Sequence, residues 1–239
     1  MTTMDMTAIA TESGAESFVS ELRAQAQRYH ALHPFHRRMN SGLLSRRQIQ
    51  GWVANRFYYQ TAIPRKDAAI LSNCPHRDIR QRWIRRIVDH DGTAEAAGGI
   101  EAWLCLGDAV GLTRDEVLRE RHVVPGVRFA VDAYVTFART RPWLEAVASS
   151  LTELFAPDLM TERLAAFERH YRWIDPRGLA YFRARLTQAP RDCEHALEVV
   201  TRYCRTPDEQ AGAVAALSFK NDVLWSMLDA IDHAYPDRS

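Results

Sequence analysis

Apolar residues recur every three or four positions along almost the whole chain, and this periodicity limits the folds open to it. Ile49, Trp52 and Val53 begin one such stripe, and Trp83 with Ile87 lies on another. This spacing places apolar side chains on one face of a helix, where they can pack against other helices. No segment alternates apolar and polar residues over the length of a strand. The sequence therefore predicts an all-α protein, a helical bundle with no sheet.

Capping residues and prolines mark where these helices begin and end. Four positions carry an N-cap signal: Ser45 with Gln48, Thr113 with Glu116, Asp175 before Pro176, and Thr206 before Pro207. Pro64 is expected to kink or end the helix that Ser45 opens. The other helices are expected over Glu16–Leu32, His76–His90, Ile100–Val110, Pro125–Arg139, Trp143–Phe155 and Pro157–Trp173, with a last one ending near Ala234.

The length of 239 residues is that of a single domain, because domains typically span roughly 50–250 residues. No repeat or linker divides the chain, so we expect one helical domain over residues 1–239, with about residues 1–14 disordered. The N-terminus lacks the pattern of a signal peptide, and no apolar run approaches the ~18 residues of a membrane span. The four cysteines form no C-x-x-C motif. We therefore expect a cytoplasmic protein with no membrane partner.

Charge excludes another class of partner. Thirty-one Lys and Arg nearly cancel thirty Asp and Glu, for a net charge of +1. A chain of this balance has no overall attraction to nucleic acid. The basic run from Arg80 to Arg86 is confined to one helix, half of which faces inward, and it matches no DNA-binding fold. We expect no nucleic-acid partner.

Polar residues interrupt the apolar stripes on several helices. They are Arg56, Gln60, Arg86, His90, Tyr134, Arg163 and Lys220. Burying a cation without a partner is very unfavourable, so any one of these is most simply explained by a buried acid or by a side chain that reaches solvent. The same stripes, however, carry few acids. Taken together, the interruptions predict an internal cationic pocket for a polycarboxylate or a polyphosphate.

Nine histidines raise the question of a metal site. No Glu is followed by His three residues later, which the helical di-iron signature requires, and there is no His-Glu-x-x-His. We therefore expect no bound metal. His90 differs from the others because it lies on a buried stripe one turn from Arg86. Either it is a hydrogen-bonded core residue, or the nearby cation keeps its ring neutral so that it can act as a general base.

Long segments of the chain resemble the pyrroloquinoline-quinone (PQQ) synthase family. The segment QIQGWVANRFYYQ, residues 48–60, is one of them. The others are residues 86–92, 98–104, 125–134, 149–157 and 186–192. The resemblance runs from about Glu16 to Tyr235. It implies a heme-oxygenase-like, or TenA-like, compact helical bundle that forms a homodimer.

The resemblance also implies an activity. The family closes the second nitrogen ring of a bicyclic quinone with three carboxylates and a free amino-acid arm, and removes eight electrons. Dioxygen is the acceptor, hydrogen peroxide is released, PQQ is the product, and no cofactor is needed. The implied catalytic residues are His90, Arg163, Tyr181, Lys220 and His30. The implied substrate-binding residues are Tyr29, Arg56, Tyr59, Gln60, Lys66, Arg86, Tyr134, Thr152 and Arg185.

We interpret the residue set as follows. The cations hold the carboxylates, His90 removes ring protons, and Tyr181 with Arg163 guides dioxygen. The sequence departs from the family at Met160, where several members have a second active-site histidine. Two alternatives stay open, a thiamin-degrading hydrolase of the same fold, which needs a nucleophilic cysteine, and a PQQ carrier without activity.

Overall fold

The computed structural model describes residues 16–237, and every regular element within this range is a helix. The disorder expected for residues 1–14 lies outside the described residues. After a first helix at residues 16–24, the elements are η1 (Gln25–Arg28), η2 (His30–Leu32), α2 (Pro34–Asn40), α3 (Arg46–Asn73), α4 (Arg77–Asp91), α5 (Gly99–Ala109), α6 (Arg114–Leu118), α7 (Pro125–Thr140), α8 (Trp143–Ala148), η3 (Ser149–Phe155), α9 (Ala156–His170), η4 (Pro176–Leu179), α10 (Ala180–Tyr203) and α11 (Pro207–Ala234). The all-α prediction is confirmed for these residues.

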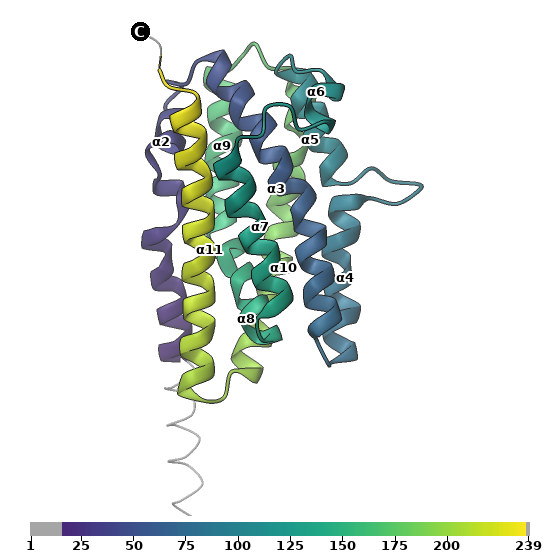
Figure 1. The fold of residues 1–239 in the computed structure, drawn as a ribbon, viewed down its shortest axis with the longest axis vertical. Coiled ribbons are helices and arrows are strands. Elements are labelled where there is room, and N and C mark those ends of the chain that lie inside the picture. The colour runs from purple at the N-terminus through teal and green to yellow at the C-terminus, as the bar shows by residue number, and fades with distance from the viewer. Residues whose placement is uncertain (1–15, 238–239) are drawn as a thin grey trace, which may run out of the picture.

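The long helices run side by side along the molecule (Figure 1). Helix α7 packs against both α3 and α11, α4 packs on α3, and α9 and η3 pack on α10. Two clusters of buried hydrophobic side chains fill the interior, one around Trp52 and Trp103 and one around Trp83. Buried cations lie against both clusters, with Arg163 over the Trp52 ring and Arg86 over the Trp83 ring.

The capping signals read from the sequence form as expected. Full capping boxes open three helices, and the Asp175 side chain accepts the backbone N–H of Arg177 at the start of η4. The capping boxes pair Ser45 with Gln48, Thr113 with Glu116 and Thr206 with Glu209. These signals are local, because the cap and its partner lie three residues apart.

Pro64 was expected either to kink or to end the helix that Ser45 opens. This helix, α3, does not end at Pro64 but continues to Asn73. Pro64 is buried, and α3 packs against α7 and α4, so tertiary packing maintains the helix through a residue that donates no hydrogen bond. Helix α9, in contrast, is shorter than expected and ends at His170.

Two of the predicted helices are interrupted. The expected helix over Glu16–Leu32 breaks where the backbone of Tyr29 is extended, between η1 and η2. The expected helix over Trp143–Phe155 changes from α to 3-10 at Ser149, whose hydroxyl donates to the carbonyl of Ala146 at 2.7 Å. A hydroxyl that bonds a backbone carbonyl competes with regular helix geometry. Both interruptions lie at the cavity described next.

Candidate active site

A buried cavity of about 60 Å³ lies between the long helices and receives side chains from the two interrupted segments. Ten of the predicted site residues line it, namely Tyr29, His30, Arg56, Tyr59, Lys66, His90, Tyr134, Thr152, Tyr181 and Arg185. The other four, Gln60, Arg86, Arg163 and Lys220, are buried and are not among the lining residues. The structure therefore brings most of the set together and keeps four members out of the lining.

Three of the buried cations have no carboxylate partner among the described residues. Lys220 donates to the Tyr59 hydroxyl at 2.7 Å, and its Nζ lies 3.4 Å from the centroid of the Tyr134 ring. Arg56 lies over the Tyr59 ring at 4.5 Å, and its Nη1 has no hydrogen-bond partner. Arg163 leaves Nε and Nη2 without a partner. Aromatic faces stabilise such cations only in part, so positive charge without a counter-ion is concentrated at this site.

The pKa values of two of these cations reflect their burial. Burial, and then the charge of nearby Arg56, lowers the pKa of Arg163 to about 9. Burial, and then the charges of Lys66 and Arg56, lowers the pKa of Lys220 well below its ordinary value. A carboxylate brought among these groups would favour their charged forms. The site is therefore suited to an anionic ligand.

The remaining cations are paired with carboxylates of the protein, so for these the expectation that a bound polyanion supplies the counter-ions is wrong. Arg86 and Arg185 both bind Glu153, at 2.8 and 3.0 Å, and Lys66 binds Asp67 at 2.6 Å. Arg185 also lies 3.5 Å from Asp192. These acids come from η3 and α10 or from the adjacent residue, so a stripe on a single helix does not reveal them.

His90 is held in one tautomer with its second nitrogen free. Its Nδ1 lies 3.0 Å from the backbone carbonyl of Arg86, which can only accept, so Nδ1 carries the proton. Its Nε2 is buried without a partner. Burial, and then the charge of Arg185, lowers the pKa of His90 to about 4. A pKa this low agrees with the expected neutral ring, but burial is the larger cause and the contributing cation is Arg185 and not Arg86.

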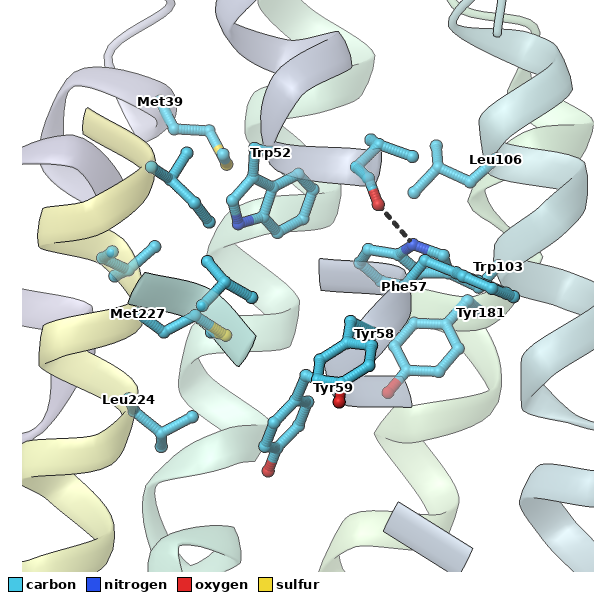
Figure 2. Close-up of a cluster of buried hydrophobic side chains, with 14 of the residues drawn as sticks. Met39, Trp52, Phe57, Tyr58, Tyr59, Trp103, Leu106, Tyr181, Leu224 and Met227 are labelled. Atoms are coloured by element: carbon cyan, nitrogen blue, oxygen red, sulfur yellow. Dashed lines mark hydrogen bonds between the residues drawn. The ribbon is translucent and has the colours of Figure 1, made fainter. Parts of the chain in front are cut away.

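Tyrosines and a second histidine complete the wall of the cavity. Figure 2 shows Tyr59 and Tyr181 below Trp52 and Trp103, with their hydroxyls directed away from the tryptophans. The Tyr181 hydroxyl donates to Oε1 of Gln60 at 2.9 Å. Burial, and then the charges of Arg56 and Arg163, lowers the pKa of His30 well below its ordinary value. A second ring nitrogen without a proton is thus available, since the His30 ring is also neutral.

A family model described as the TENA/THI-4/PQQC family matches residues 19–230. The chain belongs to this family. It is 59% identical over 218 residues to the pyrroloquinoline-quinone synthase of Pseudomonas aeruginosa strain LESB58, covering 91% of this chain and 87% of the relative. It is 56% identical over 220 residues to the enzyme of the same name from Cronobacter sakazakii, covering 92% and 88%.

Solved structures show that the fold is heme-oxygenase-like, as expected. A TenA homologue from Pseudomonas syringae pv. tomato matches with a TM-score of 0.71 at 14% identity, covering 91% of this chain and 92% of that one. A domain with a heme oxygenase-like fold from Shewanella denitrificans matches with a TM-score of 0.71 at 13% identity, covering 98% and 94%. Over residues 16–237, none of the helices has both the length and the apolar character needed to cross a membrane.

The sequence analysis missed several residues that line the cavity. They are Ile63, Ser150, Glu153, Ala156 and Leu224. Ser150 accepts a hydrogen bond from Lys66 at 2.8 Å, and Glu153 pairs two arginines. Both lie in residues 149–157, a segment that resembles the PQQ synthase family, so the signal was present. Met160 also lines the cavity, at the position where the sequence departs from several members.

Buried neutral histidines predict a loss of stability in mild acid. Burial lowers the pKa of His90 and of His195 to about 4, against about 6.5 in the unfolded chain. Between these values the unfolded state binds more protons, so the free energy of unfolding falls as pH falls from about 6.5 to 4. The slope is at most about 1.4 kcal/mol per pH unit for each group. Urea unfolding at pH 7, 6 and 5 measures it.

The same experiment on His195→Asn gives the control. This variant should show a shallower pH dependence, because it removes one of the groups that titrate on unfolding. A free energy of unfolding that does not change between pH 7 and 5 would contradict the neutral burial of these rings.

Proposed function

We propose that this protein catalyses the final step of PQQ biosynthesis as a cofactor-free oxidase. It closes the second nitrogen ring of the precursor quinone and removes eight electrons, with dioxygen as acceptor and hydrogen peroxide as by-product. The observation that supports this most directly is a group of three buried cations without a carboxylate partner among the described residues, of which Arg56 lines the cavity, in a chain 56–59% identical to proteins named pyrroloquinoline-quinone synthase. We further propose that it acts in the cytoplasm as a homodimer.

In this proposal the unpaired cations bind the carboxylates of the substrate. Arg56, Arg163 and Lys220, which have no carboxylate partner among the described residues, gain counter-ions from the substrate. Fixed in this way, the amine of the side arm lies next to the quinone carbonyl that it attacks, which lowers the entropic part of the barrier. His90 takes protons from ring carbons at Nε2, its free nitrogen. Tyr181, with Arg163, then positions dioxygen near the reduced ring.

Binding requires the cavity to enlarge. Sites for molecules of this size typically occupy about 300–1,000 Å³, whereas this cavity measures about 60 Å³. Glu153 and Arg185 both line the cavity and form an ion pair with each other. Their side chains would have to separate or shift to admit the quinone. This ion pair is therefore part of the binding equilibrium.

The thiamin-degrading alternative lacks a nucleophile at this site. No cysteine is among the residues that line the cavity in the described part of the chain. Burial raises the pKa of Cys193 to about 12 and that of Cys204 to about 11, which suppresses their thiolates. The cationic wall would also repel the positively charged thiazolium of thiamin.

Incubation with the precursor quinone tests the proposal and separates an enzyme from a carrier. We expect no PQQ spectrum under anaerobic conditions, full conversion after admission of air, and the same rate after treatment with a chelator. Binding without conversion in air would indicate a carrier, and would contradict the proposed function. Iron in stoichiometric amount whose removal abolishes turnover would contradict the absence of a metal requirement. Within residues 16–237, no three His, Cys, Asp or Glu side chains are grouped so that they could hold a metal ion.

A further inference from the structure

Glu153 differs in charge from everything else around the cavity. Among the lining residues of the described chain it alone has a carboxylate, while Arg56, Lys66 and Arg185 contribute positive charge. Its side chain is 19% exposed, the highest value in its cluster of ion pairs with Arg86 and Arg185. A single acid is thus accessible from the cavity in a wall that otherwise attracts anions.

We infer that Glu153 binds the ammonium group of the substrate's amino-acid arm, an inference that rests on the proposed function. The substrate has three carboxylates, which the cations attract, and one ammonium, which they repel. An ammonium placed beside Arg56 or Lys66 would meet like charge in a buried site, which is strongly unfavourable. Beside Glu153 it gains a charge-assisted hydrogen bond. Glu153 therefore determines which end of the molecule lies at η3.

The contacts of the arginines leave Glu153 free to take this role. Arg86 also donates to the backbone carbonyl of Asp192, and Arg185 also lies 3.5 Å from the Asp192 carboxylate. Both guanidinium groups therefore keep a partner when Glu153 turns toward an ammonium. The Oε2 atom of Glu153 lies 2.8 Å from Nη1 of Arg86 without a hydrogen bond of good geometry, and Oε1 accepts from Arg185 at 3.0 Å, so each carboxylate oxygen keeps a lone pair that can accept from an ammonium.

Another acid near the cavity is less suited to this role. Asp67 is fully buried and does not line the cavity. Its Oδ1 binds Lys66 at 2.6 Å and accepts the indole N–H of Trp83 at 2.9 Å. Its Oδ2 makes no hydrogen bond, but it is buried and outside the cavity lining, so an ammonium held in the cavity does not reach it.

The difference between substrate and product provides the test, because the amine becomes a ring nitrogen in PQQ and no longer carries an ammonium. In Glu153→Gln, the KM and the anaerobic dissociation constant of the precursor should rise about 10- to 100-fold, the loss expected for one charge-assisted hydrogen bond. The dissociation constant of PQQ should stay equal or fall, since a negative charge near a trianion has been removed. Substrate and product affinities thus change separately.

Asp192→Asn is the matched control, because it also removes a negative charge beside Arg185 but from a residue outside the cavity lining. If Asp192 acts only through Arg185, this variant should change the affinities for precursor and PQQ by the same factor. If Glu153→Gln also changes the affinities for precursor and PQQ by the same factor, the inference is overturned. Glu153 would then be a structural counter-ion only.

A second measurement needs no variant, in case Glu153→Gln does not fold. The analogue of the precursor in which hydrogen replaces the amine should bind the wild-type protein about 10- to 100-fold more weakly than the precursor. Equal or tighter binding of the analogue would overturn the inference. If the wild-type protein neither binds PQQ nor converts the precursor, the proposed function itself fails. If the wild-type protein converts the precursor and a folded Glu153→Gln variant has the wild-type KM, only the role of Glu153 is overturned.

Discussion

A His90→Asn variant is expected to fold, to bind PQQ, and to carry out the first proton removal about 10²–10⁴-fold more slowly than the wild type. The amide can still donate to the backbone carbonyl that now accepts from Nδ1, but it provides no basic nitrogen in place of Nε2. Single-turnover absorbance measurements after rapid mixing with aerated buffer follow the step directly. A partly oxidised intermediate with a shifted visible spectrum should accumulate.

The low pKa of His90 affects the interpretation of this experiment. A ring with a pKa of about 4 is always neutral at pH 7, but it is a weak base. Carboxylates bound nearby favour the imidazolium, so the pKa should rise when the substrate binds. We therefore expect the acid limb of kcat to lie at higher pH than the acid limb of kcat/KM, since the second reports the free protein.

His195→Asn is a close control for His90→Asn. His195 is also buried, its Nε2 also has no partner, and its pKa is also lowered to about 4, but it does not line the cavity. Its variant should turn over at the wild-type rate. A folded His90→Asn protein with a wild-type single-turnover rate would show that the base lies elsewhere, and His30 and Tyr181 would be the next to substitute.

The sequence predicts those features of the fold that depend on neighbours along the chain. The capping box of Ser45 forms because Gln48 is three residues away, and the two stripes that contain Trp52 and Trp83 are buried because their period matches the helix. The break at Tyr29 and the 3-10 turn at Ser149 are not visible in this way. Apolar periodicity continues through both, and packing against distant helices decides the backbone geometry.

The same limit applies to the site. Burial of Arg86, Arg163 and Lys220 follows from their place on apolar stripes, and the structure confirms it. Their partners do not follow, because Glu153 lies on another element, 67 positions from Arg86 in the printed numbering. Arg86 is therefore an arginine in an ion pair behind the cavity wall, whereas Arg163 and Lys220 have no carboxylate partner within residues 16–237. Only the three-dimensional structure separates these two kinds of cation.

This separation gives the last prediction, in which binding and stability change in opposite directions. Arg163→Met and Lys220→Met should each weaken PQQ binding by about 2–5 kcal/mol, the range for removing one member of a buried charge pair. Titration of the PQQ absorbance or of the intrinsic tryptophan fluorescence measures this. Unchanged affinity in both variants would rule out the anionic-pocket hypothesis.

Without added ligand, the Arg163→Met and Lys220→Met variants should nevertheless be more stable than the wild type. Folding lowers the pKa of Arg163 and of Lys220, so the folded state disfavours their charged forms at pH 7, and an apolar side chain of similar size removes that cost. Arg86→Met is the matched contrast, because it leaves Glu153 with one arginine fewer and should destabilise the fold. We therefore expect thermal unfolding midpoints above the wild type for Arg163→Met and Lys220→Met and below it for Arg86→Met. Equal destabilisation of the three variants would mean that Arg163 and Lys220 have counter-ions within the protein. Their positive charge would then not be available to bind the carboxylates of a ligand.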